Sequence, residues 1–264
     1  MNKTIQNFRQ TVFDHFQLHG RSFPWRETQD PYAIWISEIM LQQTQTDRVV
    51  PKYTAFLRAF PTPKALEEAE IQEVLKLWQG LGYNRRGIAL HNAAKIIMSE
   101  YRGKLPQSEA QLRKLPGIGT YTSAAICAFA YNLPVIMIET NIRRAFIHHF
   151  FSDQEGVSDS ELFPLIEQAV DHENPRIWYY ALMDYGAWLA KQVPNPNRRS
   201  KHYTKQGTFA GSNRQLRGML VRLSLQKPDS TLADIVLETG AHPEKITALI
   251  HTMQEEGFPL PFNE

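Results

Sequence analysis

The feature that most constrains this chain is a glycine turn between two apolar segments, at residues 115–119 (Leu-Pro-Gly-Ile-Gly). Segments 108–115 and 120–131 on either side of the turn carry apolar residues at helical spacing. Gly117 and Gly119 permit positive φ and a close approach of another backbone. We therefore predict a helical hairpin whose turn amides lie at the positive end of the second helix, where they can hold a phosphate.

An acidic residue further along makes this hairpin more than a packing turn. Glu139 follows the apolar run 135–138 and stands directly before a helical segment at 140–150. A carboxylate in this position emerges from an apolar wall at the start of a helix. The pattern fits a functional carboxylate, and a simple helix cap is the alternative.

Helical periodicity runs through most of the chain, and the alternation typical of strands is almost absent. Proline and glycine separate the helical segments. We predict an all-α fold with helices near 2–18, 31–42, 46–60, 71–79, 86–101, 108–115, 120–131, 140–150, 159–171 and 175–191. A smaller unit after Gly211, with helices at 214–226, 232–238 and 243–256, looks like a winged-helix or helix-turn-helix module. A small packing cap is an equal alternative for this unit.

Length and composition limit the class of protein. A chain of 264 residues with 42% hydrophobic residues can bury a core as one or two domains. No apolar run approaches the roughly 18 residues that would span a bilayer, and the N-terminus lacks a signal-peptide pattern. We expect a soluble, cytoplasmic protein of unknown oligomeric state. The single cysteine, Cys127, rules out a disulfide within the chain and an all-cysteine metal site.

The small net charge of +2 hides a basic segment. Residues 185–228 contain no Asp or Glu and carry nine cationic side chains, Lys191, Arg198, Arg199, Lys201, Lys205, Arg214, Arg217, Arg222 and Lys227. Like charges in one segment usually mark a solvated face. Because Asn, Ser, Thr and Tyr side chains lie among them, the segment favours contact with nucleic-acid phosphates.

Three further motifs accompany the hairpin and Glu139. They are residues 23–26 (Phe-Pro-Trp-Arg), residues 38–44 (Glu-Ile-Met-Leu-Gln-Gln-Thr) and residues 77–83 (Leu-Trp-Gln-Gly-Leu-Gly-Tyr). Together they resemble the helix-hairpin-helix DNA glycosylase superfamily, and within it the MutY-like adenine DNA glycosylases. The match runs in register from about residue 5 to about residue 190, and Glu-x-x-Leu-Gln-Gln-Thr is its most specific part.

The resemblance implies a two-lobed fold with DNA across the cleft between the lobes. The implied parts are a terminal lobe of residues 1–24 with 135–192, a six-helix lobe at 25–134, a basic linker at 193–212 and a C-terminal module at 213–264. Family members usually hold an iron-sulfur cluster on cysteines that follow the 178–188 helix. This chain has no cysteine there, so we expect no cofactor, and we expect the basic linker to anchor DNA directly. Whether the backbone carbonyls of hairpin 115–119 bind a monovalent or divalent cation stays an open question. We also expect the larger C-terminal domain of many MutY proteins to be missing.

Two carboxyl groups suit the cleavage of an N-glycosidic bond, one donating a proton to the base and one facing the cationic sugar. The resemblance assigns these roles to Glu38 and Glu139, with Asn141 and Tyr121 completing the catalytic set. Glu38 lies among Trp35, Ile39 and Leu41, an apolar setting that should keep it partly protonated near neutral pH. A solvated glutamate on a helix face is the alternative.

Two positions decide what kind of glycosylase the resemblance implies. Glu139 stands where the superfamily nearly always has aspartate, so either the backbone has adjusted or the activity has changed; we favour retained activity. Tyr121 stands where bifunctional relatives carry a lysine that attacks the sugar. Tyrosine cannot form that Schiff base, so the enzyme should be monofunctional, with water as nucleophile.

The resemblance also implies a set of DNA contacts, because the target base must leave the stack and its gap must be filled. Asn84 replaces a second aromatic residue that is common after Tyr83, which leaves the opposite-base preference open. The implied DNA-binding residues are Trp25, Arg26, Gln42, Gln43, Thr44, Leu81, Tyr83, Gly117, Gly119, Thr120, Arg143, Arg198, Arg199 and Lys201.

The sequence thus predicts a base excision repair enzyme that binds double-stranded DNA with a mismatched or damaged base. The leading interpretation is removal of adenine opposite 8-oxoguanine or guanine. Uracil or thymine excision from mismatches with guanine is the first alternative, and Glu38 disfavours it because protonation at N7 is purine chemistry. A catalytically impaired lesion-binding protein is the second. Such an enzyme would be associated with a bacterial nucleoid through its function.

Overall fold

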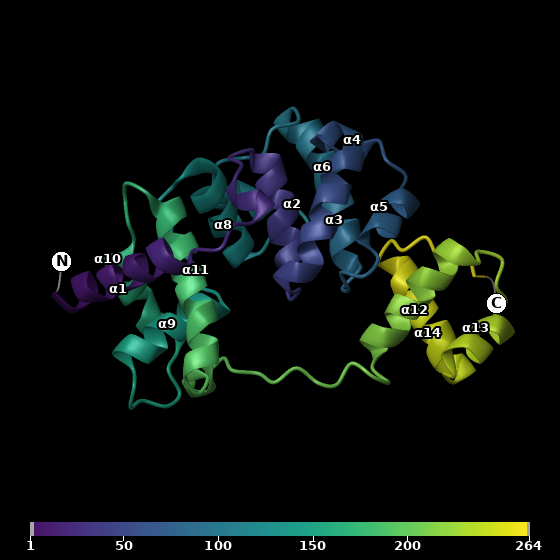
Figure 1. Ribbon diagram of the computed structural model, residues 1–264. Coiled ribbons are helices and arrows are strands. Elements are labelled where there is room, and N and C mark those ends of the chain that lie inside the picture. The colour runs from purple at the N-terminus through teal and green to yellow at the C-terminus, as the bar shows by residue number, and fades with distance from the viewer. Residues whose placement is uncertain (1–2, 263–264) are drawn as a thin grey trace. The chain divides into compact units, whose positions relative to one another are not determined.

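A computed structural model describes residues 3–262 of the chain and confirms the all-α fold (Figure 1). Among these residues the only extended pairing is one isolated bridge, Val157 with Ser200. None of their helices combines the length and apolar character needed to cross a membrane. The elements are α1 Lys3–His19, η1 Pro24–Arg26, α2 Pro31–Leu41, α3 Thr46–Ala59, α4 Pro63–Glu67, α5 Ile71–Trp78, α6 Arg85–Tyr101, α7 Glu109–Leu112, α8 Thr120–Tyr131, α9 Thr140–Phe150, α10 Asp159–Ala169, α11 Pro175–Gln192, η2 Pro196–Arg199, α12 Asn213–Gln226, α13 Leu232–Thr239 and α14 Pro243–Glu255.

Two segments differ from the sequence prediction. The helix expected at 108–115 ends at Leu112, because Pro116 disfavours a helical conformation in the residue before it and cannot donate an amide. Helix α4 is not among the predicted helices. Its signal is nonetheless present, since the Thr62 hydroxyl accepts a bond from the Ala65 amide at 3.1 Å and Pro63 fills the first helical position.

Contacts divide the chain into two compact units that each combine separate segments. Helix α2 begins in the first unit and ends in the second. The boundaries of the two units do not coincide with those of the lobes expected from the family resemblance. The lobes stay predictions. Unit 1 comprises Met1–Ile34, Pro106–Lys114 and Ile118–Lys205, and unit 2 comprises Trp35–Leu105, Leu115–Gly117 and Gln206–Glu264.

Helices α9 and α11 form the centre of unit 1. Phe8 from α1 makes edge contacts with Phe146 at 4.9 Å and with Trp178 at 6.1 Å between ring centroids. Gly186 lets α11 approach α9 closely, because a Cβ atom there would lie 2.2 Å from the backbone oxygen of Asn141. The start of α9, where Glu139 stands, is therefore held against a rigid neighbour.

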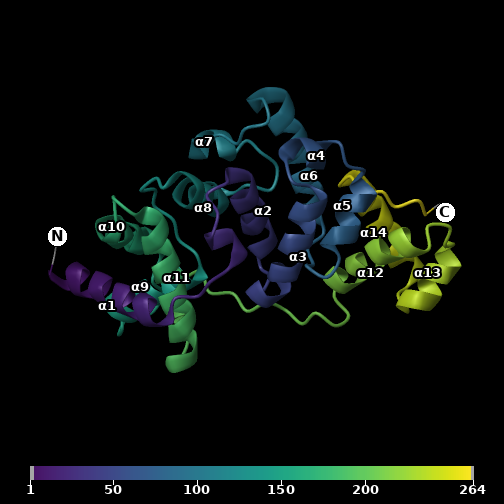
Figure 2. The ribbon, with the colours of Figure 1, turned by 45° about the horizontal axis from the view of Figure 1, so that its top comes forward.

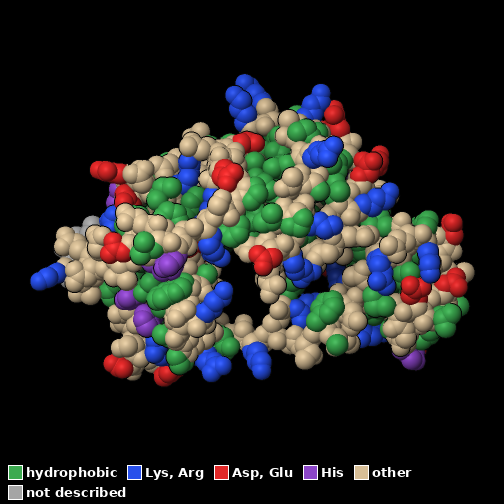
Figure 3. Space-filling view, in the orientation of Figure 1, with side chains coloured by type: hydrophobic (Ala, Val, Ile, Leu, Met, Phe, Trp, Pro, Cys, Tyr) green, Lys and Arg blue, Asp and Glu red, His purple; other side chains and the backbone are tan. Residues whose placement is uncertain are grey.

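Unit 2 joins the helices α3 to α6 to the C-terminal helices α12 to α14. Leu75 of α5 and Ile88 of α6 belong to the same buried cluster as Leu220, Val221 and Phe258. Figure 2 shows α12 and α14 beside α5. On the face seen in Figure 3, Lys and Arg side chains gather over α12. The C-terminal helices therefore share a buried cluster with α5 and α6, and the predicted division into a separate module stays a prediction.

Candidate active site

Glu139 caps helix α9 with its side chain. Its Oε1 accepts bonds from the backbone amides of Asn141 at 2.7 Å and Ile142 at 2.9 Å. Burial raises the pKa of the Glu139 carboxyl above its ordinary value, while the two amides and the charges of Arg144 and Arg143 oppose that rise. The carboxylate is thus held in one orientation. A cap and a catalytic group are compatible in this geometry.

A chain of hydrogen bonds fixes the second oxygen. Oε2 of Glu139 accepts from Nδ2 of Asn141 at 3.2 Å, and Oδ1 of Asn141 accepts from Nη1 of Arg144 at 2.7 Å. The same Nη1 donates to the backbone oxygen of Gly186 at 2.8 Å, and Nε donates to Oδ1 of Asn195 at 3.3 Å. Arg144 therefore connects Glu139 to α11 and to the segment after it, a role that no motif in the sequence indicates.

The segment after α11 is bound to α9. Nδ2 of Asn197 donates to the backbone oxygen of Thr140 at 2.9 Å, and Nη1 of Arg199 donates to the backbone oxygen of Ser152 at 2.6 Å. Arg198 and Lys201 are exposed. Of the cationic side chains predicted to contact DNA here, these two are free to reach solvent, whereas Arg199 supports the fold.

Two further arginines of the predicted DNA-binding set are occupied by carboxylates. Arg143 forms a two-bond pair with Asp159, at 2.8 and 2.7 Å. Arg26 forms one with the buried Asp184, both bonds at 2.8 Å, and lies over the ring of Tyr180. Trp25 is only 4% exposed and stacks on Phe23. The structure therefore gives these three residues packing and pairing partners, and their contact with DNA stays a prediction.

The glycine hairpin is present, but its two glycines differ. Gly117 has φ +79°, and a Cβ atom there would lie 3.0 Å from the Cβ of Ala89. Gly119 has φ −91° and open space around it, so it does not use the positive φ that glycine permits. Helix α8 starts at Thr120, and its first-turn amides face the hairpin at the positive end of the helix, with Tyr121 in the same turn.

Glu38 lies in the apolar setting that the sequence predicted. It is 6% exposed on α2, next to the fully buried Trp35 and the 1% exposed Ile39. The alternative of a solvated helix face is excluded by this burial.

Arg86 is the central residue of unit 2 that sequence reasoning missed. Its Nη1 donates to the backbone oxygens of Ile39, Met40 and Gln42 at 2.7, 2.9 and 2.7 Å, which are otherwise left open where α2 ends. Burial lowers the pKa of Arg86 to about 10. Its Nη2 donates to the Thr44 hydroxyl, Leu81 and Gly82 at 3.0, 3.3 and 2.9 Å. One guanidinium thus joins the end of α2 to the turn before α6.

The two loops that Arg86 joins expose two side chains. Gln43 and Tyr83 both adopt the left-handed region, with φ of 54° and 46°, which costs on the order of 1 kcal/mol or more for residues other than glycine. Leu81, which the sequence placed among the intercalating residues, is only 2% exposed. Gln43 and Tyr83 are thus exposed on strained backbone, whereas Leu81 belongs to the core.

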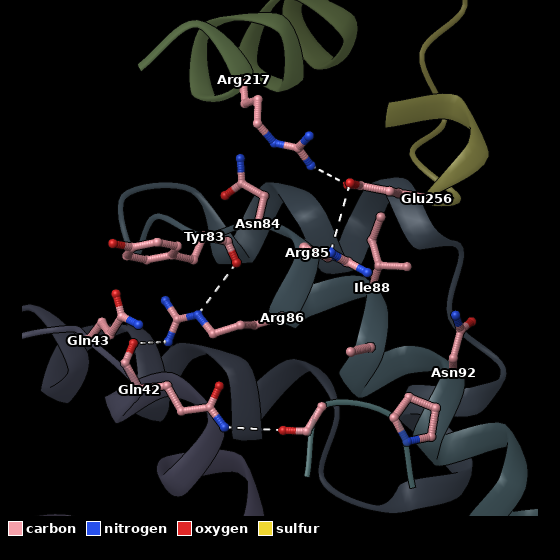
Figure 4. A pocket seen from close by; sticks show the side chains of 13 residues that line it. Gln42, Gln43, Tyr83, Asn84, Arg85, Arg86, Ile88, Asn92, Arg217 and Glu256 are labelled. Carbon is pink, nitrogen blue, oxygen red and sulfur yellow. Dashed lines mark hydrogen bonds and ion pairs between the residues drawn. The ribbon is translucent and has the colours of Figure 1, made fainter. Parts of the chain in front are cut away.

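These loops border a cavity of about 840 Å³ in unit 2 (Figure 4). Nε2 of Gln42 donates to the backbone oxygen of Gly117 at 3.2 Å across its floor. The structure thus brings Gln42, Gln43, Tyr83 and the hairpin glycine Gly117 together at one cavity. Thr44 lies behind them, bonded to the backbone oxygen of Leu81 at 3.2 Å. Glu139 and Asn141 meet in unit 1.

An iron-sulfur cluster does not fit the donors of this chain. Cys127 is buried in α8, and burial raises the pKa of its thiol to about 11. The position after α11 holds Asn195 and Asn197, whose side chains form hydrogen bonds with Arg144 and with the backbone of Thr140. No group of His, Cys, Asp or Glu suited to a metal ion occurs in residues 3–262.

The fold and these motifs agree with a known class. The family described as "HhH-GPD superfamily base excision DNA repair protein" matches residues 36–166. An adenine DNA glycosylase of Mycobacterium tuberculosis is 32% identical over 233 residues, which are 78% of this chain and 74% of that protein. The chain belongs to the HhH-GPD superfamily of base excision DNA repair proteins.

Within that superfamily the chain is similar to MutY-like adenine DNA glycosylases. The enzyme of Buchnera aphidicola subsp. Baizongia pistaciae is 36% identical over 193 residues, covering 72% of this chain and 55% of the relative. The chain thus spans about half the length of this relative. Among solved structures, a thermostable thymine-DNA glycosylase aligns with a TM-score of 0.65 and 28% identity, covering 70% of this chain and 87% of that one.

Proposed function

We propose that this chain is a monofunctional DNA glycosylase that removes adenine mispaired with 8-oxoguanine or guanine. The observation that carries the proposal is the burial of Glu38 within the Glu-x-x-Leu-Gln-Gln-Thr motif, at 6% exposure on an apolar helix. A neutral carboxylic acid at this position can donate a proton to a purine. The curated relatives, named adenine DNA glycosylases, support the same substrate.

In the proposed reaction Glu38 donates its proton to N7 of the adenine that has been flipped from the duplex. Protonation makes the base a better leaving group, so the bond between C1′ and N9 breaks and positive charge develops on the sugar. Glu139, ionised and oriented by Asn141, stabilises that charge. Water then adds to C1′ and releases a proton, which restores the protonated form of Glu38 through solvent, and free adenine and an abasic site remain.

Tyr121 supports the absence of strand cleavage in this proposal. It lies in the first turn of α8, at the position where bifunctional relatives carry a lysine. A phenol cannot form a Schiff base with the sugar, so the reaction ends at the abasic site. The proposed proton donor and the group that stabilises the sugar cation are the carboxyl groups of Glu38 and Glu139. Because its substrate would be chromosomal DNA, the enzyme would work in the cytoplasm at the nucleoid.

Gln43 and Tyr83 are the residues that we propose to enter the duplex when the base leaves it. Both are exposed, and Arg86 binds the backbone oxygen of the residue before each of them, Gln42 and Gly82. Filling the gap left by an extruded base offsets part of the cost of unstacking. The burial of Leu81 leaves this role to the other two side chains.

Excision of thymine or uracil opposite guanine is the second candidate, favoured by the similarity to a thermostable thymine-DNA glycosylase. A lesion-binding protein without activity is the third, because Glu139 departs from the usual aspartate. Incubation of purified protein with duplexes containing one A:8-oxoG, A:G, U:G or T:G pair, followed by alkali, separates the three. We expect cleavage only of the strand that carries adenine. Cleavage at U:G or T:G alone, or binding without any cleavage, would replace the proposal by the second or third candidate.

A further inference from the structure

The C-terminal helices and the turn before α6 enclose a second hollow in unit 2. Its volume is about 560 Å³, and α12, the chain leading to it and residues 79–84 form its walls. The hollow is distinct from the Glu38 and Glu139 sites. We call it the arginine groove, after the side chains that line it, Arg48, Arg214, Arg217 and Arg222.

The groove is a fixed feature because its two walls share a core. Leu75 of α5 and Ile88 of α6 pack in one buried cluster with Leu220 of α12 and Phe258, which follows α14. Glu256 pairs with Arg217 and lies 3.9 Å from Arg85. The apolar faces of the C-terminal helices thus hold α12 against helices α5 and α6.

The charge of the groove is positive and largely uncompensated. Among the described residues that line it, none is Asp or Glu. Arg217 is paired with Glu256, but Arg214 donates to the Tyr83 hydroxyl at 3.0 Å and to the backbone oxygen of Gly207 at 2.6 Å, which are neutral acceptors. Arg48 likewise donates to the backbone oxygen of Gly80. A groove of this kind attracts an anion.

Aromatic surface lies beside these charges. Phe209 is 61% exposed and Tyr83 is 37% exposed, and both line the groove with the apolar side chains of Val221 and Met253. Exposed rings next to arginines match the two parts of a nucleotide, a flat base that stacks and a phosphate that needs a cation. A duplex backbone alone would call for the arginines and not for the rings.

We infer that the arginine groove binds one unpaired nucleotide of a DNA strand, with the base against Phe209 and the phosphate against Arg222 and Arg48. The inference deepens the proposed function and rests on it for the presence of a distorted duplex. It assigns residues 206–264 the task of holding a displaced strand next to Tyr83. Gln206 and Arg214, which both donate to the Tyr83 hydroxyl, couple this groove to the turn that is proposed to enter the duplex.

Two variants test the groove in the full-length chain. Arg222→Gln removes one exposed charge from its wall, and Phe209→Ala removes the stacking surface. Lys227→Gln is the matched control, because it removes one charge from the end of α12 at a residue that pairs with Glu238 at 2.9 Å outside the groove. The probes are a fluorescent duplex with one unpaired thymidine and the same duplex fully paired, and the dissociation constant is measured over a range of salt.

We expect Phe209→Ala to weaken binding of the bulged duplex by roughly 5- to 100-fold and that of the paired duplex much less, as the loss of one stacking contact implies. Arg222→Gln should lower the slope of log K against log salt by about one, and Lys227→Gln should lower it less. Equal effects of Phe209→Ala on both duplexes, or equal slopes for the two charge variants, overturn the inference.

A second readout separates this inference from the proposed function. Single-turnover excision at saturating enzyme should be the same for the parent protein and the control Lys227→Gln, because Lys227 lies outside the groove and outside the proposed catalytic set. If the parent protein excises no base from any mismatch but the bulged duplex still responds to Phe209→Ala, the proposed function fails and the groove stands. If excision proceeds and binding does not respond, the groove fails alone.

Discussion

Glu139 receives three hydrogen bonds from the two residues Asn141 and Ile142, and the side chain of Asn141 supplies the one that reaches Oε2, at 3.2 Å. This arrangement fixes a carboxylate that would otherwise rotate about an extra methylene compared with aspartate. It also separates two properties of Glu139 that experiments can address individually. Oε1 caps the helix by accepting from two backbone amides. Oε2 accepts from the side chain of Asn141.

Glu139→Gln tests the charge while keeping an acceptor for the two amides. We expect single-turnover excision of adenine to slow by roughly two orders of magnitude or more, about 3 kcal/mol of lost electrostatic stabilisation. Thermal stability should stay equal or rise at pH 7, because a carboxyl whose pKa is raised by burial is penalised when ionised. Glu139→Ala, which loses the cap, is the control and should lower stability by about 1 kcal/mol. Undiminished excision by Glu139→Gln would leave the residue as a cap only.

The raised pKa of Glu139 predicts where activity is lost in acid. Because burial moves the pKa above its ordinary value of 4.5, the carboxylate becomes protonated at a higher pH than a solvated glutamate. The excision rate should therefore fall as pH drops toward that raised value. Arg144→Gln removes a positive charge that lowers the pKa, so the fall should begin at a still higher pH. A profile that is identical in the parent protein and in Arg144→Gln would contradict the coupling.

Asp184 should be the most stability-sensitive ion-pair residue of unit 1. It is 2% exposed and accepts from Arg21 and Arg26. Asp184→Asn leaves two guanidinium groups poorly paired, so we expect a loss of about 3–5 kcal/mol of unfolding free energy in urea titrations at pH 7. Asp171→Asn, which breaks the more exposed pair with Arg9, is the control and should cost at most about 1 kcal/mol.

The pH dependence of Asp184 has a definite sign. Burial acts to raise its pKa, but the bonds and charges of Arg26 and Arg21 outweigh burial, and the net pKa lies below the ordinary 3.8. The unfolded chain then binds the proton more readily, so this contribution is complete above pH 3.8 and is lost as the pH falls through the folded-state pKa. Asp184→Asn should therefore flatten the acid limb of the stability curve. An unchanged acid limb would show that other carboxylates dominate it.

Arg86 organises the loops that carry Gln43 and Tyr83, and Arg86→Lys tests this because lysine keeps the charge but loses the planar donor array. Several bonds to backbone oxygens would be lost, each worth about 1 kcal/mol, so we expect a stability loss of about 2–4 kcal/mol. Discrimination between mismatched and paired duplexes should also weaken. Arg85→Lys, at a side chain that is 72% exposed, is the control and should change neither measurement.

Arg198 and Arg199 are neighbours with different expected roles. Arg198 is exposed, so Arg198→Ala should reduce the slope of log K against log salt by about one without loss of stability. Arg199 donates to the backbone oxygen of Ser152 at 2.6 Å, so Arg199→Ala should lower the melting temperature and change the salt slope less. If the two variants have the same salt slope and melting temperature, the division between them is wrong.

The helices could be predicted from the sequence because each depends on local spacing and on its own breakers. Helices 120–131 and 140–150 appear with the predicted bounds. The role of Arg86 could not be predicted, because its acceptors come from residues 39–44 and 81–83, which only the folded chain brings together. The same holds for Leu81, whose burial depends on long-range packing, and for the docking of α12 to α5.

The most direct test of the account is the single-turnover rate on adenine compared with 7-deazaadenine, each placed opposite 8-oxoguanine in the same duplex. Replacing N7 by carbon removes the atom to which Glu38 is proposed to donate its proton, while the shape and pairing of the base are kept. We predict that adenine is excised and that 7-deazaadenine is excised at least about 100-fold more slowly, in line with the effect of general acid catalysis. Equal rates on the two bases would contradict the role of Glu38 and with it the proposed mechanism.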